Sequence, residues 1–126
     1  MKGVSVIIKK DDKYLLLQQA RGRPFELKWM PPSGAVEEGE ELADAAKREV
    51  KEETGLEIEN LEEAAMLKAD YKADELHFFT ADWKSGDMNP DIRELNKYGW
   101  FTKEEIKKLD LMKATKEFFE RYSEEM

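Results

Sequence analysis

The sequence predicts an α+β fold in which a β-sheet is covered on both faces, and three segments carry this prediction. Residues 3–9 and 14–19 are nearly continuous apolar runs joined by a short polar segment, as in a β-hairpin. Uninterrupted apolar strands are typical of a sheet that is buried on both faces. Residues 41–54 repeat apolar side chains at the spacing of a helix that buries one stripe.

The remaining elements follow from the same criteria. Thr102 is expected to begin a short helix as its N-cap, with Glu105 at the capping-box position. The other predicted elements are strands at 56–68, 76–81 and 95–101, turns or loops at 10–13, 20–28, 71–74 and 84–91, and a closing helix at 112–122.

The length and composition are those of one globular domain, which we assign to residues 1–126. The chain has 126 residues, of which 40% are hydrophobic, and this is enough for a single core. No apolar run approaches the length of a membrane span, and the start MKGVSVIIKK reaches charged residues too early for a signal peptide. We therefore expect a cytoplasmic protein that does not associate with a membrane.

Residue types and charge exclude several classes of function. The chain has no cysteine, so disulfides, thiolate catalysis and cysteine-based zinc sites are excluded. The single histidine, His77, excludes a multi-histidine metal site, and its apolar neighbours indicate a packed strand residue rather than a catalyst. The formal net charge of −8 argues against binding a nucleic-acid polymer, but not against a small nucleotide held through a metal.

The predicted helix 41–54 carries an unusual face near its end. Glu49 and Glu53 lie at nearly the same azimuth as the apolar Leu42 and Ala46. Glu52 lies beside Ala45, on the same apolar side of the helix. Like charges at these spacings repel by roughly 0.2–0.5 kcal/mol a pair, and the helix dipole disfavours anions in the last turns. The cluster therefore indicates a functional site for a hard divalent cation, Mg²⁺ or Mn²⁺. The alternative is a solvated acidic helix end.

The spacing of the residues around this cluster resembles the Nudix box. The defining positions of that family are all present in this sequence, over one continuous stretch. Five residues separate Gly34 from Glu40, and seven separate Glu40 from Arg48-Glu49-Val50. One residue then precedes Glu52-Glu53, and one more precedes Gly55-Leu56.

This resemblance implies a fold and a reaction. The fold is an α/β/α sandwich with a mixed central β-sheet, in which the box forms a loop–helix–loop. The reaction is the Mg²⁺-dependent hydrolysis of a nucleoside diphosphate linked to another group, with Mn²⁺ as a second option for the metal. By the same match, Glu49, Glu52 and Glu53 would hold the metal and act in catalysis, and Glu40 is a secondary candidate ligand.

Other box residues are expected to support the site. Arg48, the only cation of the box, would fix a neighbouring carboxylate through charge-assisted hydrogen bonds. Three glycines would shape the backbone: Gly34 as a permissive turn, Gly39 before the helix and Gly55 as its C-cap. Family members usually carry a glycine at position 33 as well, where this sequence has Ser33. A role of residue 33 that needs a glycine conformation is therefore in doubt.

An acid beyond the box completes the candidate site. Glu94 follows the polar loop 84–91, at a position where many relatives carry an acid that serves as a metal ligand or as the base. Asp87 and Asp91 are its rivals. We expect either Glu49 or Glu94 to accept the proton of the attacking water.

The candidate substrate-binding residues lie outside the helix. Arg21 and Arg23 precede the box, where a basic residue often meets substrate phosphate in similar proteins; solvated loop charges are the alternative. Trp29 would either enter the core or line the nucleotide pocket. Tyr71 lies where dinucleoside polyphosphate hydrolases often carry a tyrosine, whereas the proline of ADP-ribose hydrolases is missing from this region.

The function predicted from the sequence is therefore that of a pyrophosphohydrolase acting on a small nucleotide. Nucleoside triphosphates, dinucleoside polyphosphates, ADP-ribose and nucleotide sugars all remain candidate substrates, and a homodimer is left open. A nucleotide-sensing module without turnover is the first alternative, although a pure binder has no need of a repulsive glutamate triad. An acidic structural protein with incidental Ca²⁺ affinity is the second.

Overall fold

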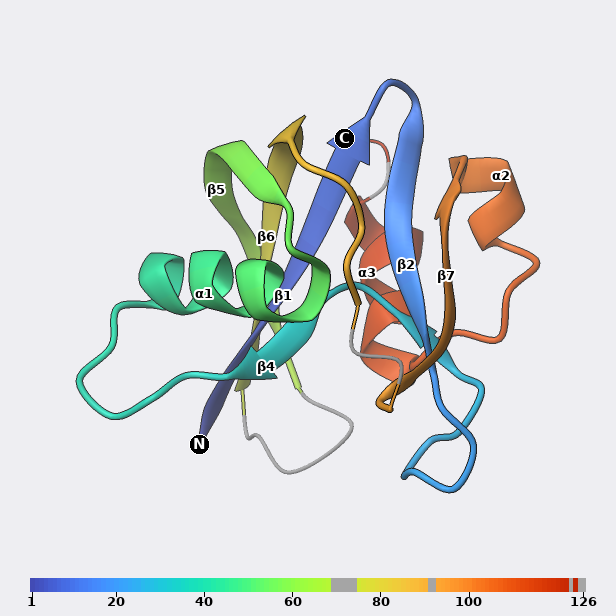
Figure 1. Ribbon diagram of the computed structural model, residues 1–126, viewed down its shortest axis with the longest axis horizontal. Coiled ribbons are helices and arrows are strands. Elements are labelled where there is room, and N and C mark those ends of the chain that lie inside the picture. The colour runs from blue at the N-terminus through green and yellow to red at the C-terminus, as the bar shows by residue number, and fades with distance from the viewer. Residues whose placement is uncertain (69–74, 91–92, 123, 125–126) are drawn as a thin grey trace.

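The computed structural model describes residues 1–68, 75–90, 93–122 and 124, which form a seven-stranded sheet with helices on both faces (Figure 1). The strands are β1 (Lys2–Lys10), β2 (Lys13–Gln19), β3 (Trp29–Met30), β4 (Ser33–Ala35), β5 (Glu57–Leu67), β6 (Glu75–Ser85) and β7 (Leu95–Phe101). The helices are α1 (Leu42–Thr54), α2 (Lys103–Ile106) and α3 (Lys113–Tyr122).

The sheet is built around β1. This strand pairs antiparallel with β2 and parallel with β6, and β5 adds antiparallel to the other side of β6. Strand β2 in turn pairs antiparallel with β3 and β7. The short β4 pairs antiparallel with β1, where Gly34 lies opposite Val4. The sheet is therefore mixed, as the resemblance implied.

Alternating side chains of the central strand reach two separate cores. Val6 and Ile8 join a core with Ala46 of α1, whereas the intervening Ile7 joins a second core with Phe118 of α3. Figure 1 shows α1 in front of the sheet and α3 behind it. Residues 3–8 of β1 are all buried, which explains why this strand is an uninterrupted apolar run. The predicted cover on both faces is confirmed.

The predicted long elements are confirmed, and the differences concern extensions and short strands. The strand predicted at 76–81 continues to Ser85 in β6, because Ile58 and Glu57 of β5 still pair with Trp83 and Ser85. The two- and three-residue strands β3 and β4 were not predicted. The turn predicted at 71–74 lies outside the described residues.

The C-terminal helices close the second core. The Thr102 side chain accepts a hydrogen bond from the Glu105 N–H, and the Glu105 carboxylate accepts one from the Thr102 N–H, so the predicted capping box is confirmed. The Phe118 ring stacks with Phe78 and Tyr122, at centroid distances of 4.7 and 5.2 Å. Among the described residues, no helix combines the length and the apolarity that crossing a membrane would require.

Candidate active site

The end of α1, the strand β4 and the start of β7 enclose a pocket of about 370 Å³. The three acids predicted on the inner face of the helix lie together in it, and Glu94 joins them from the segment before β7. Asp87, its rival, is not among the lining residues, and Asp91 lies outside the described residues. The pocket is lined by Ser33, Glu49, Glu52, Glu53, Glu94 and Leu95.

Backbone hydrogen bonds fix both Glu94 and the residue that follows the helix end. Gly55 ends α1 in the left-handed conformation, with φ of 77°, as its predicted role as C-cap requires. Just before it, the Thr54 carbonyl accepts a hydrogen bond from the Asn89 N–H at 2.8 Å. The Glu94 carbonyl accepts one from the Ala20 N–H at 3.0 Å. Asn89 is thus tied to the end of α1, and Glu94 to the residue that follows β2.

Glu49 fills the space that a side chain at residue 34 would occupy. A Cβ atom built on Gly34 would lie 2.0 Å from Glu49 Cδ, and 2.2 and 2.3 Å from the two carboxylate oxygens. Gly34 lies in β4 and is not among the residues with positive φ, so the prediction of a permissive turn there is wrong. The glycine is needed instead because the β4 backbone approaches the carboxylate closely. Gly39, by contrast, has a φ of 79°.

The Arg48 guanidinium contacts three carboxylates of the box: it holds Glu40 and Glu49 closely and reaches Glu52 Oε2 from Nη1 at 3.4 Å. Nε and Nη2 donate to Glu40 Oε2 and Oε1 at 2.8 and 2.9 Å, and Nη1 donates to Glu49 Oε1 at 2.8 Å. Nη2 also donates to the Ala35 carbonyl at 2.9 Å, which ties the network to β4. This arrangement is the orienting role predicted for Arg48. The hydrogen bond from Arg48 is the main reason why the pKa of Glu40 falls to about 2.

Glu40 is engaged away from the pocket. Both of its oxygens accept from Arg48, and Oε1 also accepts from the Glu37 N–H at 3.0 Å. Glu40 is not among the residues that line the pocket. It influences the site through Arg48, and this arrangement does not support the secondary metal-ligand role predicted for it.

Glu53 has the most strongly perturbed carboxylate of the pocket. Its burial, followed by the charge of Glu49 and to a lesser extent that of Glu94, raises its pKa well above the ordinary value. A hydrogen bond from the Ser33 N–H to Glu53 Oε1, at 3.2 Å, acts in the opposite direction. Burial also raises the pKa of Glu49, partly offset by Arg48. Burial and the neighbouring acids therefore both disfavour the charged forms of Glu53 and Glu49.

Ser33 takes part in this site without a glycine conformation. It is not among the residues with positive φ, and its Oγ lies 2.8 Å from Ser5 Oγ and 2.9 Å from the Pro31 carbonyl oxygen. Its N–H is the group that reaches Glu53. Sequence reasoning missed this contact, because it depends on β4 lying across the end of α1; the only signal was the position of Ser33 next to Gly34.

The donors of the pocket fit a hard divalent cation by type. All four acids offer carboxylate oxygens, the ligands that Mg²⁺ and Mn²⁺ prefer. A cation would also offset the crowding that raises the pKa of Glu53 and Glu49. Within the described part of the chain, no three Asp, Glu, His or Cys side chains already converge as a metal site. Arg48 donates to Glu49 at 2.8 Å and to Glu52 at 3.4 Å, and the Ser33 N–H donates to Glu53 at 3.2 Å, so three of the four carboxylates already accept hydrogen bonds.

The predicted substrate-binding residues are placed elsewhere. Trp29 is 7% exposed and packs edge-to-face against Phe101, with ring centroids 5.1 Å apart, in the core under α3. The alternative that Trp29 lines the nucleotide pocket is therefore wrong, and the core alternative is right. Arg21 and Arg23 are exposed on the loop after β2 and do not line the acidic pocket. Tyr71 lies outside the described residues.

His77 is a packed residue of β6, as expected. It is 8% exposed, and its Nδ1 and Nε2 atoms lie 2.8 Å from Glu63 Oε2 and 3.0 Å from Glu75 Oε1. It does not line the acidic pocket.

Comparison with known proteins agrees with this geometry. A family model described as NUDIX domain matches residues 1–122. The chain is 33% identical, over 103 residues, to the NAD-capped RNA hydrolase NudC of Vibrio parahaemolyticus. The matched region covers 82% of this chain and 39% of that protein. The chain is also 33% identical, over 97 residues, to the protein of that name from Photobacterium profundum, covering 77% and 36%. The chain thus spans less than half the length of these relatives.

Solved structures show the same fold. A NUDIX hydrolase from Nitrosomonas europaea superposes with a TM-score of 0.85 at 29% identity, over 98% of this chain and 70% of that one. The MutT protein from Methanosarcina mazei Go1 superposes with a TM-score of 0.78 at 26% identity, over 99% and 94%.

Proposed function

This chain belongs to the Nudix family, and on that premise we propose that it is a Mg²⁺-dependent pyrophosphohydrolase. Water attacks a phosphorus atom of a nucleoside diphosphate linked to another group, and the P–O–P bridge breaks to leave a nucleotide and a phosphorylated remainder. Mn²⁺ is the second candidate metal. The observation that carries this proposal is the acidic pocket, in which four carboxylates face one space.

The proposed ligands of the metal are Glu49, Glu52 and Glu53. When bound, divalent cations neutralise the charge of the phosphates and lower the pKa of a water molecule. The residues of the chain supply the orientation. Arg48 holds the Glu49 carboxylate at 2.8 Å and the Ser33 N–H holds that of Glu53 at 3.2 Å, so both start from defined positions.

The proton of the attacking water goes to a carboxylate that the metal leaves free. Glu49 and Glu94 are the two candidates, and both line the pocket. We prefer Glu94, because one oxygen of Glu49 already accepts a hydrogen bond from Arg48. Glu94 also belongs to a segment separate from α1 and lines the same pocket.

The substrate class is proposed more narrowly from the relatives. The NudC proteins are named for NAD-capped RNA, and NAD carries a pyrophosphate between two nucleosides, which suits the same reaction. Dinucleotides of this kind are therefore our first choice. Nucleoside triphosphates, dinucleoside polyphosphates, ADP-ribose and nucleotide sugars complete the group to be tested. Arg21 and Arg23 remain our candidates for contact with substrate phosphate, and Tyr71 for contact with the nucleotide.

A substrate panel tests the reaction. The protein is incubated with NAD, NAD-capped RNA and the other nucleotides in Mg²⁺, in Mn²⁺ and in EDTA, and the products are identified by mass spectrometry. We expect cleavage at a pyrophosphate bond that requires the metal. Saturable nucleotide binding without any product would instead indicate the sensing module, and neither binding nor product would refute both assignments.

Two variants test the site. Glu52→Gln and Glu53→Gln each remove one proposed ligand without changing the size of the side chain, and we expect both to lose most turnover while keeping their folded spectrum. Glu41→Gln is the matched control, because Glu41 begins the same helix and makes no side-chain capping hydrogen bond. Near-normal turnover in Glu52→Gln and Glu53→Gln would remove these residues from the mechanism.

A further inference from the structure

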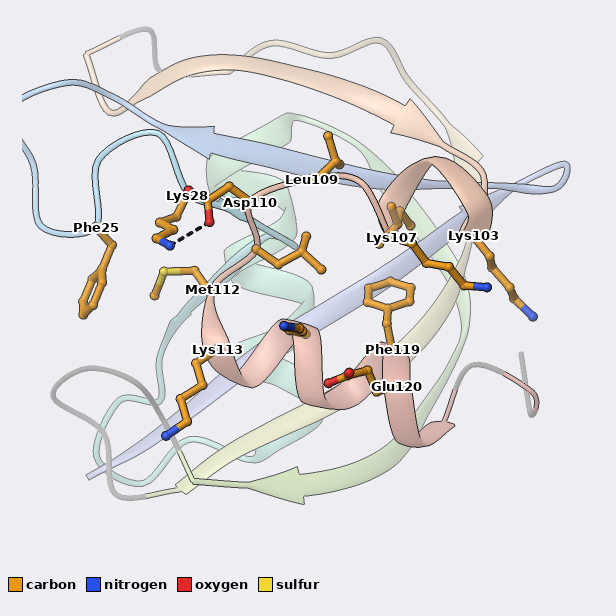
Figure 2. A pocket seen from close by; sticks show the side chains of 13 residues that line it. Phe25, Lys28, Lys103, Lys107, Leu109, Asp110, Met112, Lys113, Phe119 and Glu120 are labelled. Carbon is orange, nitrogen blue, oxygen red and sulfur yellow. Dashed lines mark hydrogen bonds and ion pairs between the residues drawn. The ribbon is translucent and has the colours of Figure 1, made fainter.

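A second hollow, of about 830 Å³, lies between α2, α3 and the loop after β2 (Figure 2). It shares no lining residue with the acidic pocket. The helices that form it cover the face of the sheet opposite α1. Five of its lining residues are lysines, although the chain as a whole has a net charge of −8. These are Lys28, Lys103, Lys107, Lys113 and Lys116.

Apolar side chains form most of the rest of this lysine hollow, and two acids, Asp110 and Glu120, also line it. Figure 2 shows Phe25 and Met112 at one end and Lys103 and Lys107 at the other. The Phe25 side chain is among the few large apolar ones that are exposed, at 39%. The hollow therefore combines an exposed aromatic ring with lysines spread from one end to the other, of which Lys28 and Lys107 are paired with Asp110 and Glu104.

The end that carries Phe25 is held in a costly conformation. Phe25 and Leu27 have φ values of 59° and 63°, in the left-handed region that non-glycine residues seldom adopt. Hydrogen bonds fasten this loop to the segment before α3. The Trp29 N–H donates to the Asp110 carbonyl at 2.8 Å, and Lys28 Nζ pairs with Asp110 Oδ1 at 2.7 Å. A strained loop that exposes an aromatic ring is better explained by a ligand than by core packing.

We propose that the lysine hollow is a second, non-catalytic site that binds a nucleoside phosphate. The base contacts the Phe25 ring and the Met112 thioether, since both groups make favourable contacts with flat aromatic systems. The phosphates lie among the lysines, whose ammonium groups bind them as point charges. The volume is in the range of small-molecule sites. The ligand is a free nucleotide or the terminal nucleotide of a strand, which present the same chemistry.

Methionine-methyl NMR tests this site directly. Met112 lines the hollow, whereas Met66 on β5 is 53% exposed and outside it. The full chain, with ¹³C-methyl methionine, is titrated with ADP in EDTA so that no turnover occurs. We expect a saturable shift of the Met112 signal, assigned with Met112→Leu, and an unchanged Met66 signal. A Met112 signal that does not respond to ADP overturns the proposal.

Charge variants identify the phosphate contacts. The double variant Lys107→Glu/Lys116→Glu is expected to weaken the response of Met112 to ADP by about tenfold or more, the effect of losing ~1.4 kcal/mol of binding free energy. The matched control is Lys2→Glu/Lys9→Glu, which makes the same change of charge at exposed positions of β1. If both double variants weaken ADP binding equally, the effect comes from net charge alone and the proposal is overturned.

Partial ligands and Phe25→Ala identify the contact with the base. Adenosine and pyrophosphate are each expected to shift Met112 less than ADP does. Phe25→Ala should weaken ADP binding and leave pyrophosphate binding unchanged. Pyrophosphate binding as tightly as ADP would overturn the assignment of a nucleoside. If a 5′-phosphorylated oligonucleotide saturates the shift of the Met112 signal at a lower concentration than ADP does, the hollow binds a strand end. If ADP saturates the shift at the lower concentration, the hollow binds a free nucleotide.

This site is independent of the proposed hydrolysis. Turnover with Mg²⁺ should be the same in wild type and in Lys107→Glu/Lys116→Glu at a substrate concentration that saturates the acidic pocket. The Met112 response of Lys107→Glu/Lys116→Glu, with turnover intact, therefore tests the proposal for the lysine hollow. The turnover of the acidic-pocket variants tests the proposed hydrolysis.

Discussion

The Gly34→Ala substitution should separate the chemistry of the acidic pocket from the stability of the fold. The new Cβ would lie 2.0 Å from Glu49 Cδ, whereas carbon atoms in contact are about 3.5–4.0 Å apart. The Glu49 carboxylate must therefore move by at least about 1.5 Å. That movement breaks the 2.8 Å hydrogen bond from Arg48 and changes the position of a proposed metal ligand.

We expect a large loss of activity and a small loss of stability. A misplacement of about 1 Å at a reacting centre can cost on the order of a hundredfold in rate, so turnover should fall by roughly that factor or more. The atoms that must give way belong to the end of a flexible, partly exposed side chain. The free energy of unfolding should therefore drop by less than about 1.5 kcal/mol, the typical net value of one hydrogen bond.

Gly39→Ala is the matched control for this prediction. No atom lies within 4 Å of a Cβ at Gly39, but its φ of 79° is unfavourable for alanine, at a cost of roughly 1–2 kcal/mol. This control should lose more stability than Gly34→Ala and keep its turnover. The measurements are urea unfolding in EDTA, Mg²⁺ titration and steady-state kinetics. If Gly34→Ala keeps wild-type turnover and Mg²⁺ affinity, neither catalysis nor metal binding depends on the present position of the Glu49 carboxylate.

Three further predictions follow from contacts described above. In EDTA, Glu53→Gln should be more stable than wild type at neutral pH, where Glu53 is charged and buried. Urea unfolding should show this advantage shrinking as the pH falls through the raised pKa of Glu53, because protonation then stabilises the native wild type as well. An advantage that grows toward acid would contradict the burial of this carboxylate. Arg48→Lys replaces a fork with a single donor, so turnover should fall by about 10–100-fold, the usual effect of losing a partner of a metal ligand; unchanged kinetics would show that Glu49 is held by other contacts. Phe118→Ala empties a fully buried site stacked on Phe78 and should cost about 3–5 kcal/mol in thermal or urea unfolding, with the KM of the folded enzyme unchanged; a much smaller loss would mean that the core collapses around the gap.

The sequence was sufficient for the parts of the fold that depend on local pattern. Helical periodicity predicted α1, and the capping pair Thr102 and Glu105 predicted the start of α2, because both signals lie within a few residues. The short strands β3 and β4 have no such signal, since two or three residues show no periodicity. They exist only because β1 and β2 offer partners.

The candidate site was predictable to a similar degree. The acids of α1 were found from their azimuth and spacing, and Glu94 from the resemblance of its segment to the acidic loop that Nudix proteins carry beyond the box. The space behind Gly34, the Ser33 contact and the engagement of Glu40 by Arg48 are tertiary effects that no local rule contains. The sequence favoured the core for Trp29 but left the binding pocket open, because a tryptophan suits both.

The main-chain bonds on either side of the acidic pocket have a consequence for how this fold diverges. The bonds from Asn89 to Thr54 and from Ala20 to Glu94 join main-chain atoms only, so most changes of side chain at Asn89 and Ala20 leave them in place. An engineer who exchanges these two residues to recruit a new substrate should therefore keep both bonds. Proline is the exception, because it has no N–H to donate.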